Sequence, residues 1–269
     1  LRMALEAYHG KELPDSAFIG QLMHDYVERR VFDTRPKQRF IQKLVSLMLS
    51  TRTDAQKADE LMDADEEFEK ALLNYELDSP YMTLLSDGVL QESLRQIRKG
   101  RFEDVISFSF EPLFEYLLAD EKWRALQKEQ RALSANDLIS WLQEGQDFKP
   151  LIGATEHLIF GELENNAFDA LLETVRLGEE EIVKEPFVRV LTSYYDVDKE
   201  GFGRFAVALG KLQNETAAGI LLLCSYEFNN SGLFSAALNA ATSAESLCAQ
   251  AGLEVDLAYS YNNIGLVYN

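Results

Sequence analysis

The sequence predicts a mainly α-helical protein, and three observations support this prediction. Prolines and glycines are few, at 6 and 15 of 269 residues, so long segments contain no strong helix breaker. Bulky apolar residues recur at helical spacing, as at Phe18, Leu22 and Tyr26. Hydrophobic residues make up 46% of the chain and charged residues 26%, which allows packed cores. We expect a helical bundle with a small β-hairpin, followed by an arm of helical pairs.

Turn-forming residues divide the helical pattern into segments. They predict breaks near residues 11–15, 34–37, 78–80, 146–150, 184–186 and 198–203. Gly201 and Gly203 resemble the start of a dinucleotide-binding turn, but no third glycine and no strand-to-helix context accompany them. We therefore expect a loop at these two glycines.

One segment, VISFSF at residues 105–110, departs from the helical pattern. Its β-branched and aromatic residues suit a short strand, and Phe108 and Phe110 would share one face of it. Pro112 then suits the first turn of a following helix. Upstream, residues 81–91 indicate a helix that ends near Gly88 and leads into a second strand. The polar residues 93–104 would form the wing of the hairpin, so that helix, hairpin and packed helix make a winged-helix-like unit. A plain core element is the alternative for VISFSF alone.

Five segments before Asp120 resemble, in order, the back half of the ATPase module of STAND proteins of the NACHT kind. They are LRMALEAYHGKELP (Leu1–Pro14), FIGQLMHDYVERRV (Phe18–Val31), RFIQKLVSLML (Arg39–Leu49), LLSDGVLQ (Leu84–Gln91) and VISFSFEPLFEYLLA (Val105–Ala119). The residues that match the winged-helix signature of the family are Phe108, Glu115, Tyr116 and Leu117. Phe110 stands where many members carry a histidine that senses the nucleotide phosphates. The resemblance therefore does not extend to phosphate sensing.

The chain contains no G-x-x-x-x-G-K-[ST] motif, because Lys11 is followed by Glu and Lys211 by Leu. We therefore expect no cofactor and no catalytic residue in this chain. The resemblance implies a nucleotide-binding domain, with ATP or ADP, before Leu1 in a longer protein. The leucine start and the half-repeat at the end favour the same expectation, that both ends are cut.

Metal and nucleophile motifs are also missing from the sequence. The three histidines, His9, His24 and His157, are scattered and no HExxH or CxxC spacing occurs, so we expect no metal site. Cys224 and Cys248 are expected to be small buried hydrophobes. The acidic run from Asp59 to Glu69 lacks the alternating ligands and central glycine of a calcium loop. A solvated helix face or an acidic docking patch is expected there.

The net charge of −19 argues against nucleic acid and against an anionic membrane surface as partners. No apolar run is long enough for a transmembrane helix, and no signal peptide is visible. Two cysteines without a disulfide pattern suit a reducing compartment. We therefore expect a cytoplasmic protein.

The C-terminal segment resembles tetratricopeptide repeats, in which each repeat is a pair of antiparallel helices. The residues that match the second helix of a repeat, in order, are Gly232, Phe234, Ala237, Ala241 and Ala244. In AYSYNNIGLVYN (Ala258–Asn269), Ile264, Gly265 and Tyr268 match the first helix of the next repeat. The wide spacing of the repeats predicts a long connection at residues 251–256. A single helical hairpin is the alternative.

These expectations divide the chain into three domains. We predict a helical and winged-helix-like domain at residues 1–120, a solenoid-like helical arm at 121–213 and truncated repeats at 214–269. By resemblance, Asn263 occupies the place of an asparagine that clamps a peptide. The other residues expected to line the same groove are Tyr226, Asn229, Asn262 and Asn269. A polar helix face in water is the alternative for the two adjacent asparagines.

The predicted function is that of a non-catalytic sensor part of a STAND-type signalling NTPase, in bacterial defence or regulation. The repeats would bind a protein or peptide trigger, and binding would release the module to form a homo-oligomer. The alternative is a tetratricopeptide adaptor or scaffold without nucleotide chemistry.

Overall fold

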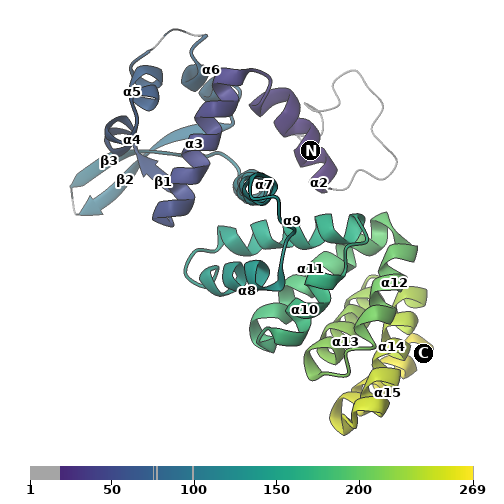
Figure 1. Cartoon of the computed structure of the whole chain (residues 1–269). Coiled ribbons are helices and arrows are strands. Elements are labelled where there is room, and N and C mark those ends of the chain that lie inside the picture. Colours follow the sequence, from purple (N-terminus) through teal and green to yellow (C-terminus); the bar gives the residue numbers. More distant parts are fainter. Residues whose placement is uncertain (1–18, 75, 77, 99, 269) are drawn as a thin grey trace. The chain divides into compact units, whose positions relative to one another are not determined.

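The computed structural model describes residues 19–268 except 75, 77 and 99, and it confirms a mainly helical fold (Figure 1). The expected elements before residue 19 lie outside the described residues. Contacts divide the chain into two units, with the boundary between Ala125 and Leu126. Among the described helices, none combines the length and apolar character that crossing a bilayer requires.

The first unit contains a small sheet and the helices around it. Its elements are α2 (Ile19–Tyr26), the π-helix η1 (Val27–Val31), α3 (Arg35–Thr51), β1 (Ala55–Lys57), α4 (Ala58–Ala64), α5 (Glu66–Leu73), α6 (Pro80–Ser86), β2 (Leu90–Arg98), β3 (Arg101–Phe108) and α7 (Glu111–Lys128). The last of these helices continues past the unit boundary. The expected breaks near residues 34–37 and 78–80 fall at the starts of α3 and α6, where a proline occupies the first turn.

The sheet is antiparallel, with strand order β1-β3-β2. Two expectations for the hairpin were wrong. The strands continue through most of the expected wing and turn at Gly100, whose φ of +78° suits glycine. Phe110 lies beyond the end of β3 and is exposed, whereas Phe108 is buried and stacks on Phe114 at 5.1 Å. The ring of Phe110 therefore does not share the buried face of the strand.

Part of the core of the first unit lies where α3 meets α5 and α6. Phe40 of α3 meets Phe68 of α5 edge to face, with ring centroids 5.1 Å apart. Lys37 is 3% exposed, and its ammonium lies 3.1 Å from the carboxylate of Asp33 and 2.9 Å from that of Asp87. The buried Lys37 and its two partly exposed carboxylate partners thus link the start of α3 to the end of α6.

The acidic run from Asp59 to Glu69 forms two short helices rather than one. Asp65 separates them, caps α5 by accepting from the Glu67 amide at 2.7 Å, and pairs with Lys43 at 2.7 Å. Leu61 and Phe68 point inward while most of the acids remain exposed. The run is thus an amphipathic pair of helices.

The second unit consists of helices alone. They are α8 (Ala135–Glu144), α9 (Pro150–Glu164), α10 (Asp169–Leu177), α11 (Glu180–Val197), α12 (Lys199–Leu209), α13 (Glu215–Asn230), α14 (Phe234–Ala251) and α15 (Glu254–Tyr268). In one layer α9, α11, α13 and α15 pack on one another in that order, and α10, α12 and α14 alternate with them along the chain (Figure 1). Every second helix thus returns to the same layer.

Three expectations for this unit were wrong. Pro186 lies inside α11, where the buried face around Phe187 outweighs a cost of about 3 kcal/mol for a proline in a helix. Gly201 and Gly203 lie in α12, not in a loop; the helix begins after the capping residue Asp198. The long connection after α14 is only two residues, because the helices themselves account for the extra length. Cys224 and Cys248 are both buried, as expected.

Candidate functional site

The exposed side of α13 and α15 is the candidate site in the second unit. The two helices are joined by the amide Nδ2 of Asn263, which donates to the backbone carbonyl of Leu222 at 3.2 Å. Residues 219, 223 and 226 lie near this bond on one face of α13, since they are three, four or seven positions apart. Residues 256, 259, 263 and 266 share one face of α15 for the same reason. The bond therefore brings these two faces together.

Large apolar and aromatic side chains remain exposed along these faces. Tyr226 is 49% exposed and Tyr259 is 59% exposed. We define the α13–α15 strip as Leu223, Tyr226, Tyr259, Asn262 and Leu266, all of which are exposed. Exposed aromatic groups with polar neighbours are typical of surfaces that bind proteins or peptides.

A charged group from α11 borders the strip. Lys184 pairs with Glu180 at 2.6 Å, and a Cβ added at Gly219 would lie 3.1 Å from each of these two side chains. Glycine at this position of α13 thus lets the ion pair lie against the helix. Burial raises the pKa of Asp256 on α15, Glu180 raises it further, and Lys184 opposes the shift. The strip therefore has an apolar part and a charged end.

The sequence-predicted residues fall on these two neighbouring helices. Tyr226 and Asn262 are exposed on the strip, and Asn263 is half-buried in the bond that joins the helices. The side-chain oxygen Oδ1 of Asn229 is buried and has no hydrogen-bond partner within the described part of the chain. Asn269 lies outside the described residues. The structure thus places four of the five residues on two helices that pack on each other, and the side-chain amide of Asn263 already donates a hydrogen bond.

Three members of the strip were not identified from the sequence: Leu223, Tyr259 and Leu266. Their helical spacing was visible, but an apolar residue on a helix is more often buried, and burial depends on which neighbouring helices cover it.

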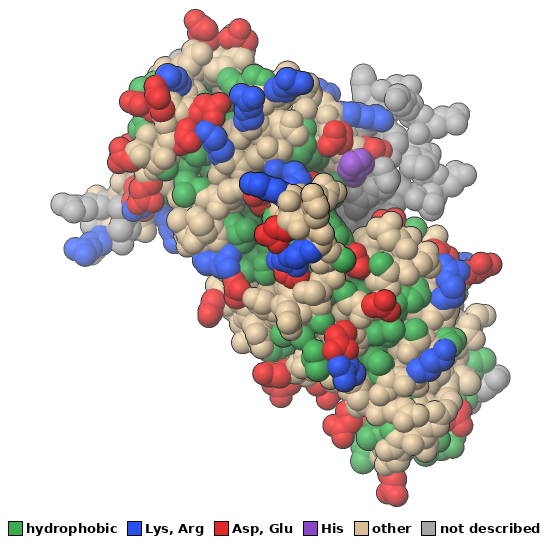
Figure 2. Space-filling model, in the orientation of Figure 1, with side chains coloured by type: hydrophobic (Ala, Val, Ile, Leu, Met, Phe, Trp, Pro, Cys, Tyr) green, Lys and Arg blue, Asp and Glu red, His purple; other side chains and the backbone are tan. Residues whose placement is uncertain are grey.

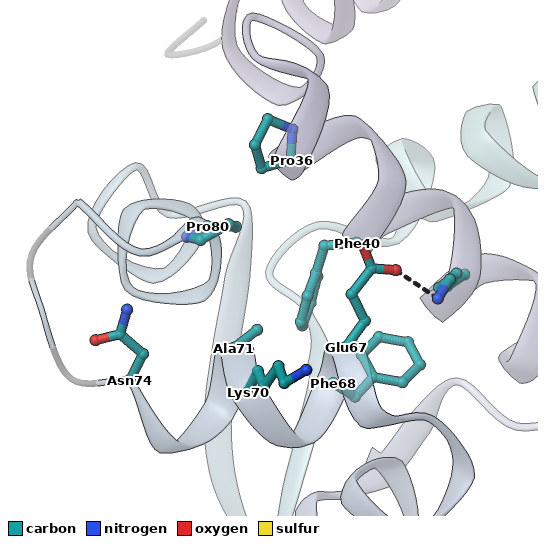
Figure 3. Close-up of a pocket in the computed structure, with 9 residues that line it drawn as sticks. Pro36, Phe40, Glu67, Phe68, Lys70, Ala71, Asn74 and Pro80 are labelled. Atoms are coloured by element: carbon teal, nitrogen blue, oxygen red, sulfur yellow. Dashed lines mark ion pairs between the residues drawn. The ribbon is translucent and has the colours of Figure 1, made fainter.

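A pocket in the first unit is the second candidate (Figure 3). Its cavity measures about 240 Å³ and lies between α3, α5 and the start of α6. Phe40, Phe68 and Ala71 provide apolar walls, and Lys43 pairs with Glu67 at 2.5 Å on its rim. Ligand pockets usually measure about 300–1,000 Å³, so this one has room for a single apolar side chain rather than a nucleotide.

The thiols and the described histidines do not form a reactive group. Burial raises the pKa of both Cys224 and Cys248, which disfavours the thiolate that a nucleophile requires. Burial lowers the pKa of His157 to about 4, so its ring is neutral near pH 7. The ring of His24 instead lies 3.0 Å from the hydroxyl of Tyr116. Within the described residues no three His, Cys, Asp or Glu side chains could together hold a metal ion.

Comparisons with known proteins identify no family for this chain: no protein-family model, no curated protein and no solved structure gives a significant match. The two candidate sites are therefore described from the geometry of the structure alone. Each candidate site is lined by apolar side chains and bordered by a charged pair.

Proposed function

We propose that this chain is a non-catalytic, protein-binding regulatory part of a STAND-type signalling NTPase. The proposal assigns recognition of a protein or peptide trigger to the α13–α15 strip and control of oligomerisation to the first unit. The observation that carries it is the strip itself, where exposed tyrosines on two adjacent helices flank an asparagine-mediated bond.

The element order of the first unit supports a winged helix. The elements follow in this order: helix α3, short strand β1, helical segment α4–α5, helix α6 and hairpin β2–β3. The short strand β1 joins the sheet beside β3. A winged helix has this order and this sheet topology.

The layered second unit supports a tetratricopeptide-like arm. The first helices of successive repeats pack side by side in such an arm, as α11, α13 and α15 do here. Ala237, Ala241 and Ala244 of α14 are fully buried, which allows close approach of the paired helices. The alternative, an adaptor without nucleotide chemistry, is favoured by the exposed Phe110 at the position expected to sense phosphate.

The strip can be tested by selecting a random peptide library on the immobilised 269-residue chain. We expect the enriched peptides, prepared synthetically, to lose about tenfold or more in affinity for the Tyr226→Ser/Tyr259→Ser variant, because exposed aromatic anchors dominate such interfaces. Phe234→Ser is the matched control, because Phe234 is a similarly exposed aromatic residue at the start of α14. Equal affinity for wild type and the double variant would exclude the α13–α15 strip as the binding site of these peptides.

The proposal that the chain belongs to an NTPase can be tested only with a longer protein. Calorimetric titration of ATP and ADP into the full gene product and into this chain separates the two alternatives. Binding only to the longer protein supports a regulatory part of an NTPase, whereas binding to neither leaves the adaptor.

A further inference from the structure

The open edge of β2 combines exposed side chains with nearby basic residues. Every described side chain from Gln91 to Gln96 is exposed, although Val105, Ile106 and Phe108 on the neighbouring strand are buried. β2 is the last strand of the described sheet on this side. In Figure 1 the far ends of β2 and β3 extend past β1. A nine-residue strand therefore presents a free edge.

The ladder shows which backbone groups point outward. The Ser109 amide donates to the Val89 carbonyl at 3.0 Å, so this facing pair is hydrogen-bonded. In an antiparallel ladder, hydrogen-bonded pairs alternate with pairs whose N–H and C=O groups point away from the partner strand. By this alternation, residues 92, 94 and 96 of β2 direct their backbone groups to the open edge. These groups can accept an added strand.

Two exposed apolar side chains lie beside this edge. Leu94 is 68% exposed and Phe102 is 58% exposed. Leu94 faces Asp104 and Gln96 faces Phe102 in the register, so Leu94 and Phe102 are diagonal neighbours on one face of the hairpin. Natural proteins protect free edges with charges and avoid exposed apolar pairs there. Leu94 and Phe102 remain exposed here, although charged residues and a register shift between Gln96 and Arg98 lie beside them.

The hairpin end is also basic in a chain of net charge −19. The segment from Arg95 to Arg101 contains four basic residues and no acidic residue. Figure 2 shows basic side chains, in blue, at this end of the hairpin. Glu103 faces Arg95 across the ladder, and its carboxylate lies 3.3 Å from the ammonium of Lys57 on β1. Glu92 and Asp104 are exposed on the face of Leu94, whereas Arg95 lies on the opposite face. The charge on the Arg95 face therefore favours an acidic partner, while the overall charge disfavours the phosphates of a nucleic acid.

We propose that the edge of β2 is a docking site for an extended acidic segment of a partner protein. The segment adds as a further strand through the outward backbone groups of residues 92–96. Its alternate apolar side chains lie against Leu94 and Phe102, and its carboxylates face Arg95 and Arg98. This site is separate from the α13–α15 strip and does not depend on it.

The test uses a fluorescein-labelled peptide of seven residues that alternates glutamate and valine. Fluorescence anisotropy with the 269-residue chain should show saturable binding. Replacing each glutamate by lysine, or methylating alternate backbone amides so that one edge of the peptide loses its N–H groups, should remove it. A 20-base-pair DNA duplex is titrated in parallel.

Two variants locate the site. We expect Leu94→Ser/Phe102→Ser and Arg95→Glu/Arg98→Glu each to weaken peptide binding about tenfold or more. Circular dichroism checks that both variants remain folded. The matched control is Arg35→Glu/Arg39→Glu, which makes the same charge change at two exposed positions of α3.

Three results would overturn the proposal. They are the absence of peptide binding, equal binding by wild type and by both hairpin variants, and full binding of the methylated peptide. Binding of the duplex in place of the peptide, with loss in Arg95→Glu/Arg98→Glu, would assign the edge to nucleic acid instead and would also overturn it.

Discussion

Replacing Gly201 by alanine should destabilise the second unit, although helix propensity alone predicts the reverse. An alanine in a helix interior is more favourable than glycine by about 1 kcal/mol. At Gly201, however, an added Cβ would collide with the hydroxyl of Tyr194 and the carboxylate of Asp198. The structure and the propensity scale therefore predict opposite signs for the same substitution.

The magnitude follows from the interactions that the collision disrupts. Asp198 caps α12 by accepting from the Gly201 amide at 2.8 Å, and loss of such a cap costs about 1 kcal/mol. The Tyr194 hydroxyl donates to the Leu163 carbonyl at 3.0 Å, and an unsatisfied buried carbonyl costs about 1–3 kcal/mol. After subtraction of the gain in propensity, we expect Gly201→Ala to lower the free energy of unfolding by about 1–3 kcal/mol.

Gly203 provides the matched control in the same helix. An added Cβ at Gly203 meets no atom within 4 Å, so Gly203→Ala should stabilise by about 0.5–1 kcal/mol. Urea unfolding followed by circular dichroism at 222 nm measures both variants. If Gly201→Ala proves as stable as Gly203→Ala, the close packing of α12 against Tyr194 does not exist as described.

Two further predictions concern buried charge. Lys37→Met should lower the free energy of unfolding by about 1 kcal/mol, because Asp33 and Asp87 lose their shared cation but remain partly hydrated. Lys70→Met, at an exposed pair, should change it by less than about 0.5 kcal/mol in the same urea assay. Burial lowers the pKa of His157 to about 4 in the folded state, whereas an unfolded histidine has a pKa of about 6.5. The unfolded state therefore binds a proton first, and the free energy of unfolding should fall as the pH drops from about 6.5 towards 4. His157→Gln should reduce that fall in thermal unfolding, and an unchanged pH profile would contradict a lowered pKa of His157.

The two binding surfaces differ in the partner that they suit. The α13–α15 strip presents tyrosines and asparagine beside an ion pair, which suits a polar and aromatic contact. The β2 edge presents backbone groups and basic side chains, which suits an extended acidic segment. The two proposals together predict two partners of different chemistry.

The sequence by itself determined the features that depend on local preference. Helical periodicity predicted the helical class, turn-forming residues predicted the breaks at the starts of α3 and α6, and the β-branched and aromatic residues 105–110 predicted a hairpin. The apolar context of Cys224 and Cys248 likewise predicted their burial. In each case the feature depends mainly on the residue itself and on its near neighbours along the chain.

Only the tertiary structure decided the features that depend on distant residues. Strand β1 has just three residues and forms because β3, about fifty positions later, supplies its hydrogen bonds. Pro186 and Gly201 remain in helices because packing of those helices outweighs their local preference to break them. Tyr259 stays exposed although its residue type favours partial burial, because α13 covers only part of that face of α15. The candidate sites depend on which side chains the neighbouring helices leave exposed, and the sequence alone does not show this.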